Sequence, residues 1–199
     1  MAPELPELLV LDAAAWADWL MERHADDAGV WLVLAKKGTV TPTSLTYNDA
    51  LEEALCHGWI DGQKGRRDES TFRQRFTPRR PGSIWSRRNV GLAEQLISNG
   101  RMHASGLLAV EQARADGRWD AAYHGSATIE VPDDLAAALA TSPKASMMFA
   151  ILTSQNRYAI LFRVADAKRA ETRASRIEKF VDMLARGETV YPQKRTLRD

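Results

Sequence analysis

Cysteine is nearly absent from this chain of 199 residues, because Cys56 is the only one. A single thiol excludes a disulfide within the chain and a metal site built from several cysteines, and it is typical of a reducing compartment. Long apolar runs are also missing, since the longest, Val30 to Ala35, falls far short of the ~18 residues that a membrane span needs. Residues 1–27 carry seven acidic side chains and one basic side chain, the reverse of the positive start of a signal peptide. We therefore expect a cytoplasmic protein that does not enter a membrane.

Recognisable catalytic and cofactor motifs are missing as well. The sequence contains no phosphate-cradling glycine loop, no nucleophile elbow and no dinucleotide-binding fingerprint. Its four histidines lack the spacing of metal ligands: His24, His57, His103 and His124. Cys56 and His57 are adjacent, but they fall at the C-terminal end of a predicted helix, where the helix dipole disfavours a thiolate. We predict no metal, no cofactor and no catalytic residue, and whether the chain is an enzyme stays open.

The overall composition is that of an ordinary globular protein. Hydrophobic residues make up 45% of the chain and charged residues 27%, and the formal net charge is +1. The length suits one domain, or one domain with a smaller appendage. It is also sufficient to bury a hydrophobic core without disulfides.

The first part of the sequence alternates helix and strand patterns. Asp12 can cap a helix that continues to about His24. The run Val30 to Ala35 is continuously apolar, which indicates a strand that is buried on both faces and central in its sheet. Thr46 can cap a second helix, which carries an apolar stripe from Tyr47 to Leu55 and ends at Gly58.

Two segments with period-two alternation follow, Trp59 to Lys64 and Thr71 to Thr77. They predict a β-hairpin with a charged loop. In the second segment the two phenylalanines share one face, and Arg73 and Arg75 share the other. If the phenylalanines enter the core, both arginines project outward together.

The rest of the sequence is mainly helical. Helices are predicted from about Ser83 or Ser86 to Ser98 and from Ala104 to Asp116, and further helices follow from Pro132 onward. We therefore predict an α+β fold, with a small antiparallel or mixed sheet of at least three strands packed with helices, followed by a C-terminal helical module. The expected parts are an α+β domain over residues 1–125, the helical module over 126–192, and a loose tail over 193–199.

Positive charge is concentrated in the hairpin and at the start of the next helix. Residues 64–88 contain nine basic and two acidic side chains, so the local balance is +7. Arg87 and Arg88 fall in the first turn of a predicted helix, where the dipole and free backbone N–H groups favour an anion. The two outward arginines of the hairpin could converge on the same place, and a tryptophan could stack on a base or ring. The predicted ligand-binding residues are Trp59, Asp61, Lys64, Arg73, Arg75, Arg79, Arg80, Trp85, Arg87, Arg88 and Asn89.

Other interpretations of these residues stay open. Arginines also coat surfaces with their apolar stems, and acidic side chains at the N-terminus could neutralise them. The acidic residues placed for this are Asp18, Glu22, Asp26 and Asp27. Trp59 and Trp85 also suit core positions, because tryptophan is usually largely buried. Asp61 could act as a base, but pairing with a nearby arginine is the more ordinary role of such a carboxylate.

Several stretches resemble the YdeI/OmpD-associated family, whose members are also described as bacteriocin-protection proteins. The stretches are VWLVLAKKG, TYNDALEEALCHGWIDGQ, QRFTPRRPGSIWSRRNV, GRWDAAY, NRYAILFRV and ETRASRIEKFVDMLARGE. The resemblance extends from Trp16 to Pro192. The C-terminal segment of the family corresponds to about Pro132–Pro192, which implies a helical second module. The resemblance supplies no catalytic reaction and therefore no catalytic residue.

Three functions are compatible with these observations. The first is a cytoplasmic protein that binds an anionic ligand (a nucleotide, a phosphate metabolite or nucleic acid) in a stress or bacteriocin-protection role. The second is an enzyme that uses the same pocket, with Asp61 and an arginine as the acting groups. The third is an interaction module whose basic patch docks an acidic protein partner.

Overall fold

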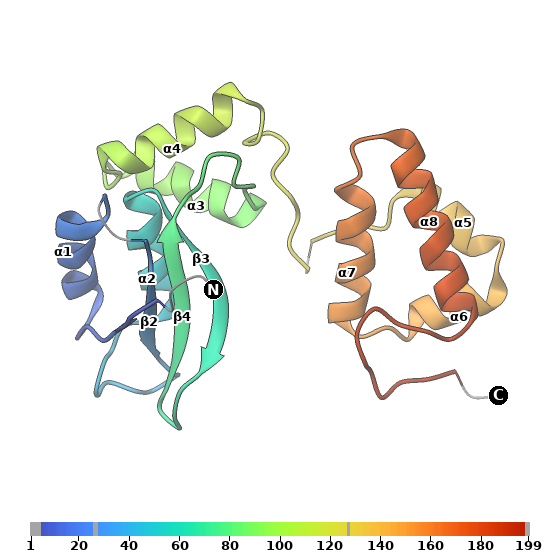
Figure 1. The fold of residues 1–199 in the computed structure, drawn as a ribbon, viewed down its shortest axis with the longest axis horizontal. Coiled ribbons are helices and arrows are strands. Elements are labelled where there is room, and N and C mark those ends of the chain that lie inside the picture. Colours follow the sequence, from blue (N-terminus) through green and yellow to red (C-terminus); the bar gives the residue numbers. More distant parts are fainter. Residues whose placement is uncertain (1–4, 26–27, 127, 198–199) are drawn as a thin grey trace. The chain divides into compact units, whose positions relative to one another are not determined.

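The computed structural model describes residues 5–25, 28–126 and 128–197, and the chain divides into two compact units, Met1–Ala122 and Tyr123–Asp199 (Figure 1). We call them unit 1 and unit 2. Unit 1 contains a mixed four-stranded sheet with helices, and unit 2 is built from helices. The predicted α+β fold with a helical C-terminal part is therefore confirmed. Among the described residues, none of the helices combines the length and the apolarity that crossing a membrane requires.

The sheet of unit 1 has the strand order β1-β2-β4-β3. The bounds are Glu7–Leu8 for β1, Val30–Ala35 for β2, Trp59–Arg66 for β3 and Thr71–Pro78 for β4. β1 runs parallel to β2, and the other neighbouring strands are antiparallel. The hairpin and the central strand agree with the prediction. β1 was not predicted, because two residues are too few to show a periodic pattern.

Four helices complete unit 1 in the part of the chain that the structure describes. Their bounds are Ala13–Arg23 for α1, Tyr47–Cys56 for α2, Arg87–Ser98 for α3 and Ala104–Ala115 for α4. The side chains of Asp12, Thr46 and Ser86 each accept a hydrogen bond from a backbone N–H of the first turn of α1, α2 and α3. Polar caps of this kind satisfy the free N–H groups at a helix start, so the predicted helix starts are confirmed.

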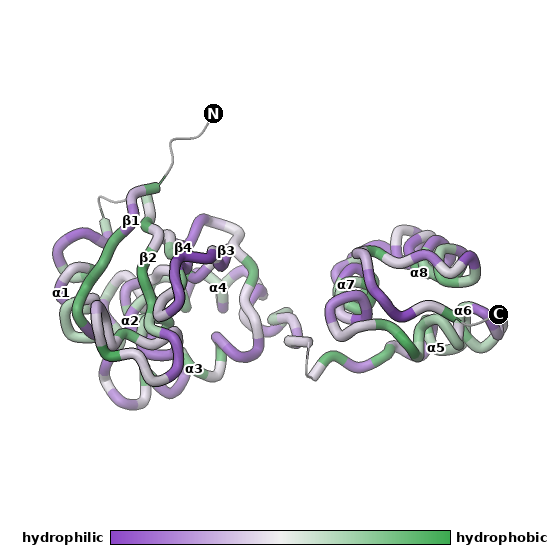
Figure 2. The backbone as a smooth tube through the Cα atoms, turned by 90° about the horizontal axis from the view of Figure 1, so that it is seen from below, coloured by the Kyte–Doolittle hydropathy of each residue, from purple (hydrophilic) through white to green (hydrophobic). Residues whose placement is uncertain are grey.

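The helices of unit 1 cover one face of the sheet. Leu32, Leu34 and Phe76 belong to the core that these helices share, and Figure 2 shows α2 and α3 on one side of the strands. Because side chains alternate along a strand, Trp31 and Val33 lie on the opposite face. β2 is central and almost entirely buried, as predicted, although none of the described helices of unit 1 packs on that second face.

Unit 2 has a separate hydrophobic core. Its helices are α5 Asp133–Ala140, α6 Pro143–Ala150, α7 Ser154–Ala165 and α8 Ala170–Ala185. The core residues include Leu135, Met148, Ile160, Leu161 and Leu184, which come from all four helices. Apolar stripes at helical spacing produce this packing, because each helix has one face to remove from water.

Candidate anion-binding site

The pairing register of β2, β4 and β3 places the predicted site residues on two different faces of the sheet. Arg73 pairs with Val33 and Arg75 with Trp31, so these four side chains share one face of the sheet, which we call the arginine face. Asp61 pairs with Phe76 and therefore lies on the helix-covered face. The structure corrects the expectation that all the basic residues gather in one place.

Trp59 and Trp85 are core residues and not ligand platforms. Trp59 is 1% exposed, its Nε1 donates to the carbonyl of His24 at 3.1 Å, and its ring lies edge-on to Trp16. Trp85 is 2% exposed and packs against Trp119 with 4.9 Å between the ring centroids. Burial of such large rings contributes strongly to the core, so the core interpretation of both tryptophans holds.

On the helix-covered face, Asp61 contacts a tyrosine where an arginine was expected. The hydroxyl of Tyr47 donates to the Asp61 carboxylate at 2.8 Å. Burial, and then the charge of Asp61, raise the pKa of Tyr47 to about 12, so Tyr47 keeps its proton at neutral pH. Arg88 lies with its guanidinium 5.3 Å from the Tyr47 ring and donates to Asn48 at 2.9 Å. Arg88 thus belongs to the side of the sheet opposite Arg73.

Three further predicted residues, which lie before and at the start of α3, contact other residues of unit 1. Arg79 stacks 3.5 Å from the centroid of Trp85, and Arg87 donates to the carbonyl of Asp120 at 3.0 Å. Asn89 is buried, and its backbone N–H is bonded to the Ser86 cap. A helix start that is partly capped offers fewer free donors to an anion, which favours the arginines of the sheet over this position as the candidate site.

Lys64 lies at the far end of the hairpin, with its ammonium 4.1 Å from the ring of Phe72. It lines a hollow of about 600 Å³ together with Lys36 and Arg66. Lys36 is already hydrogen-bonded to the hairpin loop, because its ammonium donates to the carbonyls of Asp68 and Glu69. This hollow therefore presents Lys64 and Arg66 as its available cations.

On the arginine face, two glycines of β3 make room for the two arginines of β4. A Cβ added to Gly65 would lie 2.9 Å from Cγ and Nε of Arg73, and a Cβ at Gly62 would lie 3.6 Å from the stem of Arg75. The guanidinium of Arg73 is 4.8 Å from the ring centroid of Trp31. Glycine inside a strand weakens the strand and marks a close approach, so the arginine stems are held in defined positions.

Arg75 and Arg80 line a polar hollow of about 340 Å³. The other residues that line it are Ile60, Gly62, Gln63, Thr77, Pro78 and Ser83. The lining contains two guanidinium groups, one amide and two hydroxyls, and none of the described carboxylates belongs to it. Such a set of donors matches the oxygens of a phosphate or carboxylate group.

Within the described residues, no carboxylate neutralises Arg73, Arg75 or Arg80. The ion pairs in this part of the chain use other arginines, namely Arg67, Arg101, Arg118, Arg173, Arg176 and Arg186. Of the acidic residues considered as neutralising partners, Asp18 and Glu22 form no ion pair with them, and Asp26 and Asp27 lie outside the described residues.

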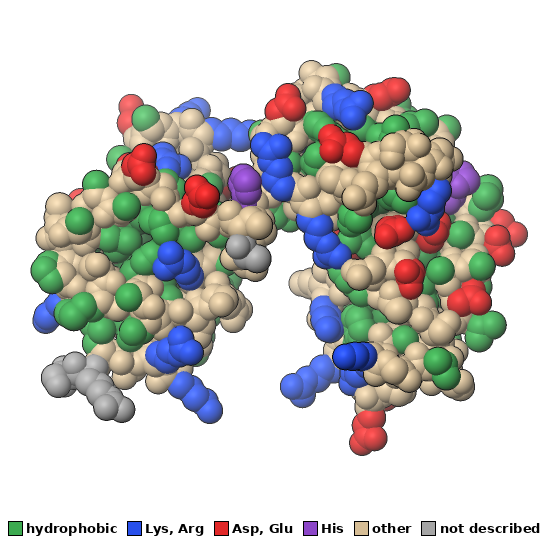
Figure 3. Space-filling model, turned by 180° about the vertical axis from the view of Figure 1, so that it is seen from behind, with side chains coloured by type: hydrophobic (Ala, Val, Ile, Leu, Met, Phe, Trp, Pro, Cys, Tyr) green, Lys and Arg blue, Asp and Glu red, His purple; other side chains and the backbone are tan. Residues whose placement is uncertain are grey.

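Figure 3 shows the opposite, helix-bearing side of unit 1, where further Lys and Arg side chains follow one margin of the unit.

Three histidines that are distant in sequence meet beside α2. The ring of His57 lies 4.0 Å from that of His103 and 5.3 Å from that of His24, centroid to centroid. Burial lowers the pKa of His57 to about 4, helped by the two neighbouring histidines. Among the described residues, no group of histidines, cysteines and carboxylates is arranged to hold a metal ion.

Cys56 is buried beside this cluster, and burial raises the pKa of its thiol to about 11. A thiol that stays protonated is a poor nucleophile, which supports the structural interpretation of this cysteine. The sequence offered no signal for the histidine cluster, because the three rings meet through the packing of α1, α2 and α4.

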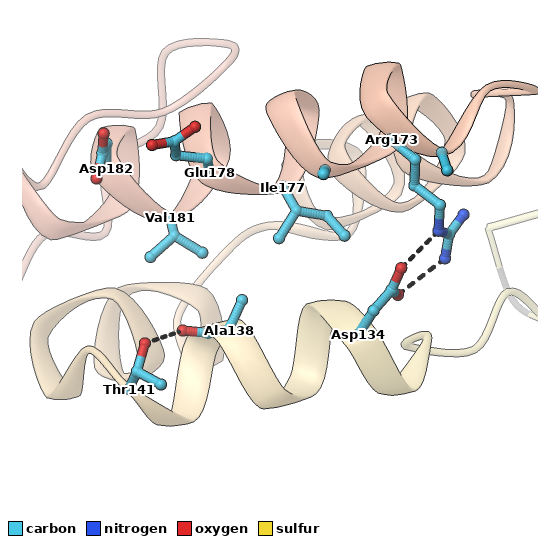
Figure 4. A pocket seen from close by; sticks show the side chains of 10 residues that line it. Asp134, Ala138, Thr141, Arg173, Ile177, Glu178, Val181 and Asp182 are labelled. Atoms are coloured by element: carbon cyan, nitrogen blue, oxygen red, sulfur yellow. Dashed lines mark hydrogen bonds and ion pairs between the residues drawn. The ribbon is translucent and has the colours of Figure 1, made fainter.

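Unit 2 contains a groove of about 520 Å³ between α5 and α8. Figure 4 shows Ile177 and Val181 of α8 directed toward α5, and Arg173 joined to Asp134 across the gap. The Nε of Arg173 lies 2.6 Å from the Asp134 carboxylate, so this cation is already paired. The groove therefore lacks the available guanidinium groups that distinguish the arginine face.

Two family models match the chain, one in each unit. Residues 8–109, half of the chain, match a model described as a domain of unknown function, DUF8412. Residues 128–187 match the model described as bacteriocin-protection, YdeI or OmpD-associated. The predicted resemblance is therefore confirmed over the helical module, whereas most of unit 1 matches a different model. Comparison with curated proteins and with solved structures found no match.

Proposed function

We propose that this chain, which belongs to the DUF8412 family, binds an anionic ligand at Arg73, Arg75 and Arg80 of unit 1. Its second unit is of the YdeI/OmpD-associated type. Neither description states a reaction or a ligand, so the proposal comes from the chemistry of the site.

One observation carries the proposal. Arg73 and Arg75 project side by side from β4 on a face where none of the described carboxylates pairs with them, and glycines of β3 hold both stems. The Nε atoms of both arginines are shielded from water and lack a hydrogen-bond partner among the described residues. Because the Nε atoms are shielded, an anion would accept from the terminal nitrogens of the two guanidinium groups, which are the outer end of each side chain.

The ligand class is defined by the donors. Guanidinium groups recognise phosphate and carboxylate oxygens with two parallel hydrogen bonds, and the hollow beside Arg80 is large enough for a phosphate group. A nucleotide, a phosphorylated metabolite and a nucleic acid all present such a group. The proposal retains the cytoplasm as the compartment and a stress or bacteriocin-protection role for the ligand-bound protein.

The two alternative functions are less well supported by the geometry. An enzyme that uses Asp61 with these arginines would need the carboxylate on the arginine face, but Asp61 lies on the other face beside Tyr47. A docking module for an acidic protein would use the same arginines. It differs from the proposal in the ligand, because it predicts binding of an acidic polypeptide and no binding of phosphate compounds.

Thermal denaturation with added ligands tests the proposal. Inorganic phosphate, pyrophosphate, nucleotides and phosphorylated metabolites are screened for an increase in the melting temperature of unit 1. A ligand at about 100 times its Kd stabilises the folded state by about 2.7 kcal/mol. Arg75→Gln and Arg80→Gln should reduce the shift caused by any true ligand.

Arg88→Gln is the matched control. It removes the same charge from the same segment of the sequence, but Arg88 lies on the helix-covered side beside Asn48. Its ligand-induced shift should equal that of the unmodified chain. If no phosphate compound shifts the melting temperature, or if all three variants respond alike, the proposed site is refuted.

A further inference from the structure

We infer that the arginine face binds single-stranded nucleic acid, with one base stacked on the guanidinium of Arg73 and a neighbouring phosphate between Arg75 and Arg80. This inference rests on the proposed function and specifies its ligand. It depends on the different ways in which the three arginines are held.

Arg73 is held as a flat platform. Its stem lies against Gly65, and its guanidinium lies 4.8 Å from the Trp31 ring centroid. The indole therefore lies against the guanidinium, and the Arg73 side chain as a whole is only half-buried. Unpaired bases stack on arginine planes as well as on aromatic rings.

Arg75 and Arg80 form the part of the face that suits a phosphate. Both line the hollow of about 340 Å³, together with the amide of Gln63 and the hydroxyls of Thr77 and Ser83. Side chains of these types supply most phosphate contacts of nucleic-acid-binding proteins, where they position the strand without reading its sequence. We therefore expect little sequence preference at this end of the face.

The arrangement favours a strand over a mononucleotide. Arg73 and Arg75 are two residues apart on β4, which places their Cα atoms about 7 Å apart along one line. Small ligands are usually bound in enclosed cavities, whereas single strands lie along a row of cations with stacking platforms. A duplex would not fit this arrangement, since its bases are already stacked inside the helix.

Among the described residues, the strand register places one carboxylate, that of Glu7, beside these arginines, and it is already paired. Glu7 of β1 lies opposite Trp31, and its carboxylate accepts from Nε of Arg67 at 2.9 Å. The pair leaves the charge of Arg73 and Arg75 uncompensated by the neighbouring strand. A polyanion therefore meets a net positive face.

Fluorescence anisotropy of the full chain with labelled oligomers tests the inference. The probes are single-stranded oligodeoxythymidylate of about twelve nucleotides, an abasic oligomer of the same length, the corresponding duplex, and inorganic polyphosphate. The single strand should bind at least about five-fold more tightly than the abasic oligomer, as expected for one stacked base. The duplex should bind no better than the abasic oligomer.

Three variants separate stacking from charge. Arg73→Lys keeps the charge but removes the plane, so it should abolish the preference for the normal over the abasic oligomer. Arg75→Gln should lower the slope of log affinity against log salt by about 0.7, the value for one phosphate contact on a single strand. Arg88→Gln, on the other side of the sheet, should change neither property, and thermal denaturation shows whether each variant is folded.

The outcomes distinguish this inference from the proposed function. If phosphate compounds stabilise the chain but normal and abasic oligomers bind equally, or Arg73→Lys retains the preference, the inference is refuted and the proposed function stands. Polyglutamate of similar charge is added as a competitor of the labelled oligomer, and if it binds as tightly as the oligomer, the face docks acidic polypeptides and the inference is again refuted. If no phosphate compound, polyphosphate or oligomer binds, both fail.

Discussion

Acid should lower the stability of unit 1, because His57 is buried and protonation of its ring is unfavourable in the folded state. The side chain is 2% exposed, and both ring nitrogens lack a hydrogen-bond partner among the described residues. The rings of His24 and His103 lie against it, so a proton on His57 would be placed among other groups that can become positive. The folded state therefore favours neutral His57.

The size of the effect follows from the pKa. Burial lowers the pKa of His57 from 6.5 to about 4 in the folded state. One pKa unit corresponds to about 1.36 kcal/mol, so protonation disfavours folding by about 3 kcal/mol when it is complete. Domains of this size are stable by about 5–15 kcal/mol, so the loss is a large fraction of the total.

The direction is fixed by which state binds the proton first. Well above pH 6.5, His57 is neutral in both states and has no effect on stability. As the pH falls from 6.5 to about 4, the unfolded chain binds a proton that the folded chain excludes, so the free energy of unfolding falls. The loss levels off below that range, because both states are then protonated.

Urea unfolding followed by tryptophan fluorescence measures this effect. All six tryptophans lie in unit 1, so the signal reports this unit even though the chain has two. His57→Phe keeps a flat ring against His103 and cannot bind a proton. The free energy of unfolding of the unmodified chain should fall by about 3 kcal/mol relative to this variant between about pH 7 and about pH 4.

His124→Phe serves as the control, because His124 is exposed and lies in unit 2. It should follow the unmodified chain at every pH. Carboxylates lose their charge over the same range in all three proteins, so only the difference between them reports His57. Parallel loss of stability in the unmodified chain and in His57→Phe would show that the buried ring is not the acid-sensitive group.

Two further predictions use the same unfolding assay. Alanine is favoured over glycine inside a helix by about 1 kcal/mol, and at Gly91 of α3 an added Cβ meets nothing within 4 Å, so Gly91→Ala should stabilise unit 1. At Gly106 of α4 the same Cβ would lie 2.2 Å from the carbonyl oxygen of Cys56, so Gly106→Ala should destabilise unit 1. If both substitutions stabilised unit 1, or both destabilised it, this account of the packing around the two glycines would be contradicted. Tyr47→Phe should lower stability by about 1 kcal/mol through the lost hydrogen bond to Asp61, and anion binding should be unchanged because Tyr47 lies on the helix-covered side.

Local structure was largely predictable from the sequence. The caps at Asp12, Thr46 and Ser86 and the apolar stripes that follow them predict helices that the structure contains. These features depend on hydrogen bonds within one turn and on a period of 3.6 residues, so neighbouring residues suffice to recognise them. The two-residue strand β1 forms only because β2 offers it a partner, and for that reason no local sequence pattern predicted it.

The candidate site was predictable in part. Alternation along β4 correctly placed Arg73 and Arg75 on one outward face, because the period of a strand is a local property. The sequence could not show that Gly62 and Gly65 of the neighbouring strand accommodate their stems, since that depends on the register between two strands. Nor could it show that Arg88 lies on the other side of the sheet.

What the sequence determined by itself, then, is the order of the helices and of the three longer strands of unit 1, the α+β class and the concentration of positive charge in one segment. The tertiary structure alone decided which of those charges share a surface, that Asp61 faces Tyr47, and that the rings of His24 and His103 lie against the buried ring of His57. The physical reason is the range of the interactions. Caps and periodicity act over a few residues, whereas charge, burial and pKa depend on side chains that only the packing of distant elements brings together.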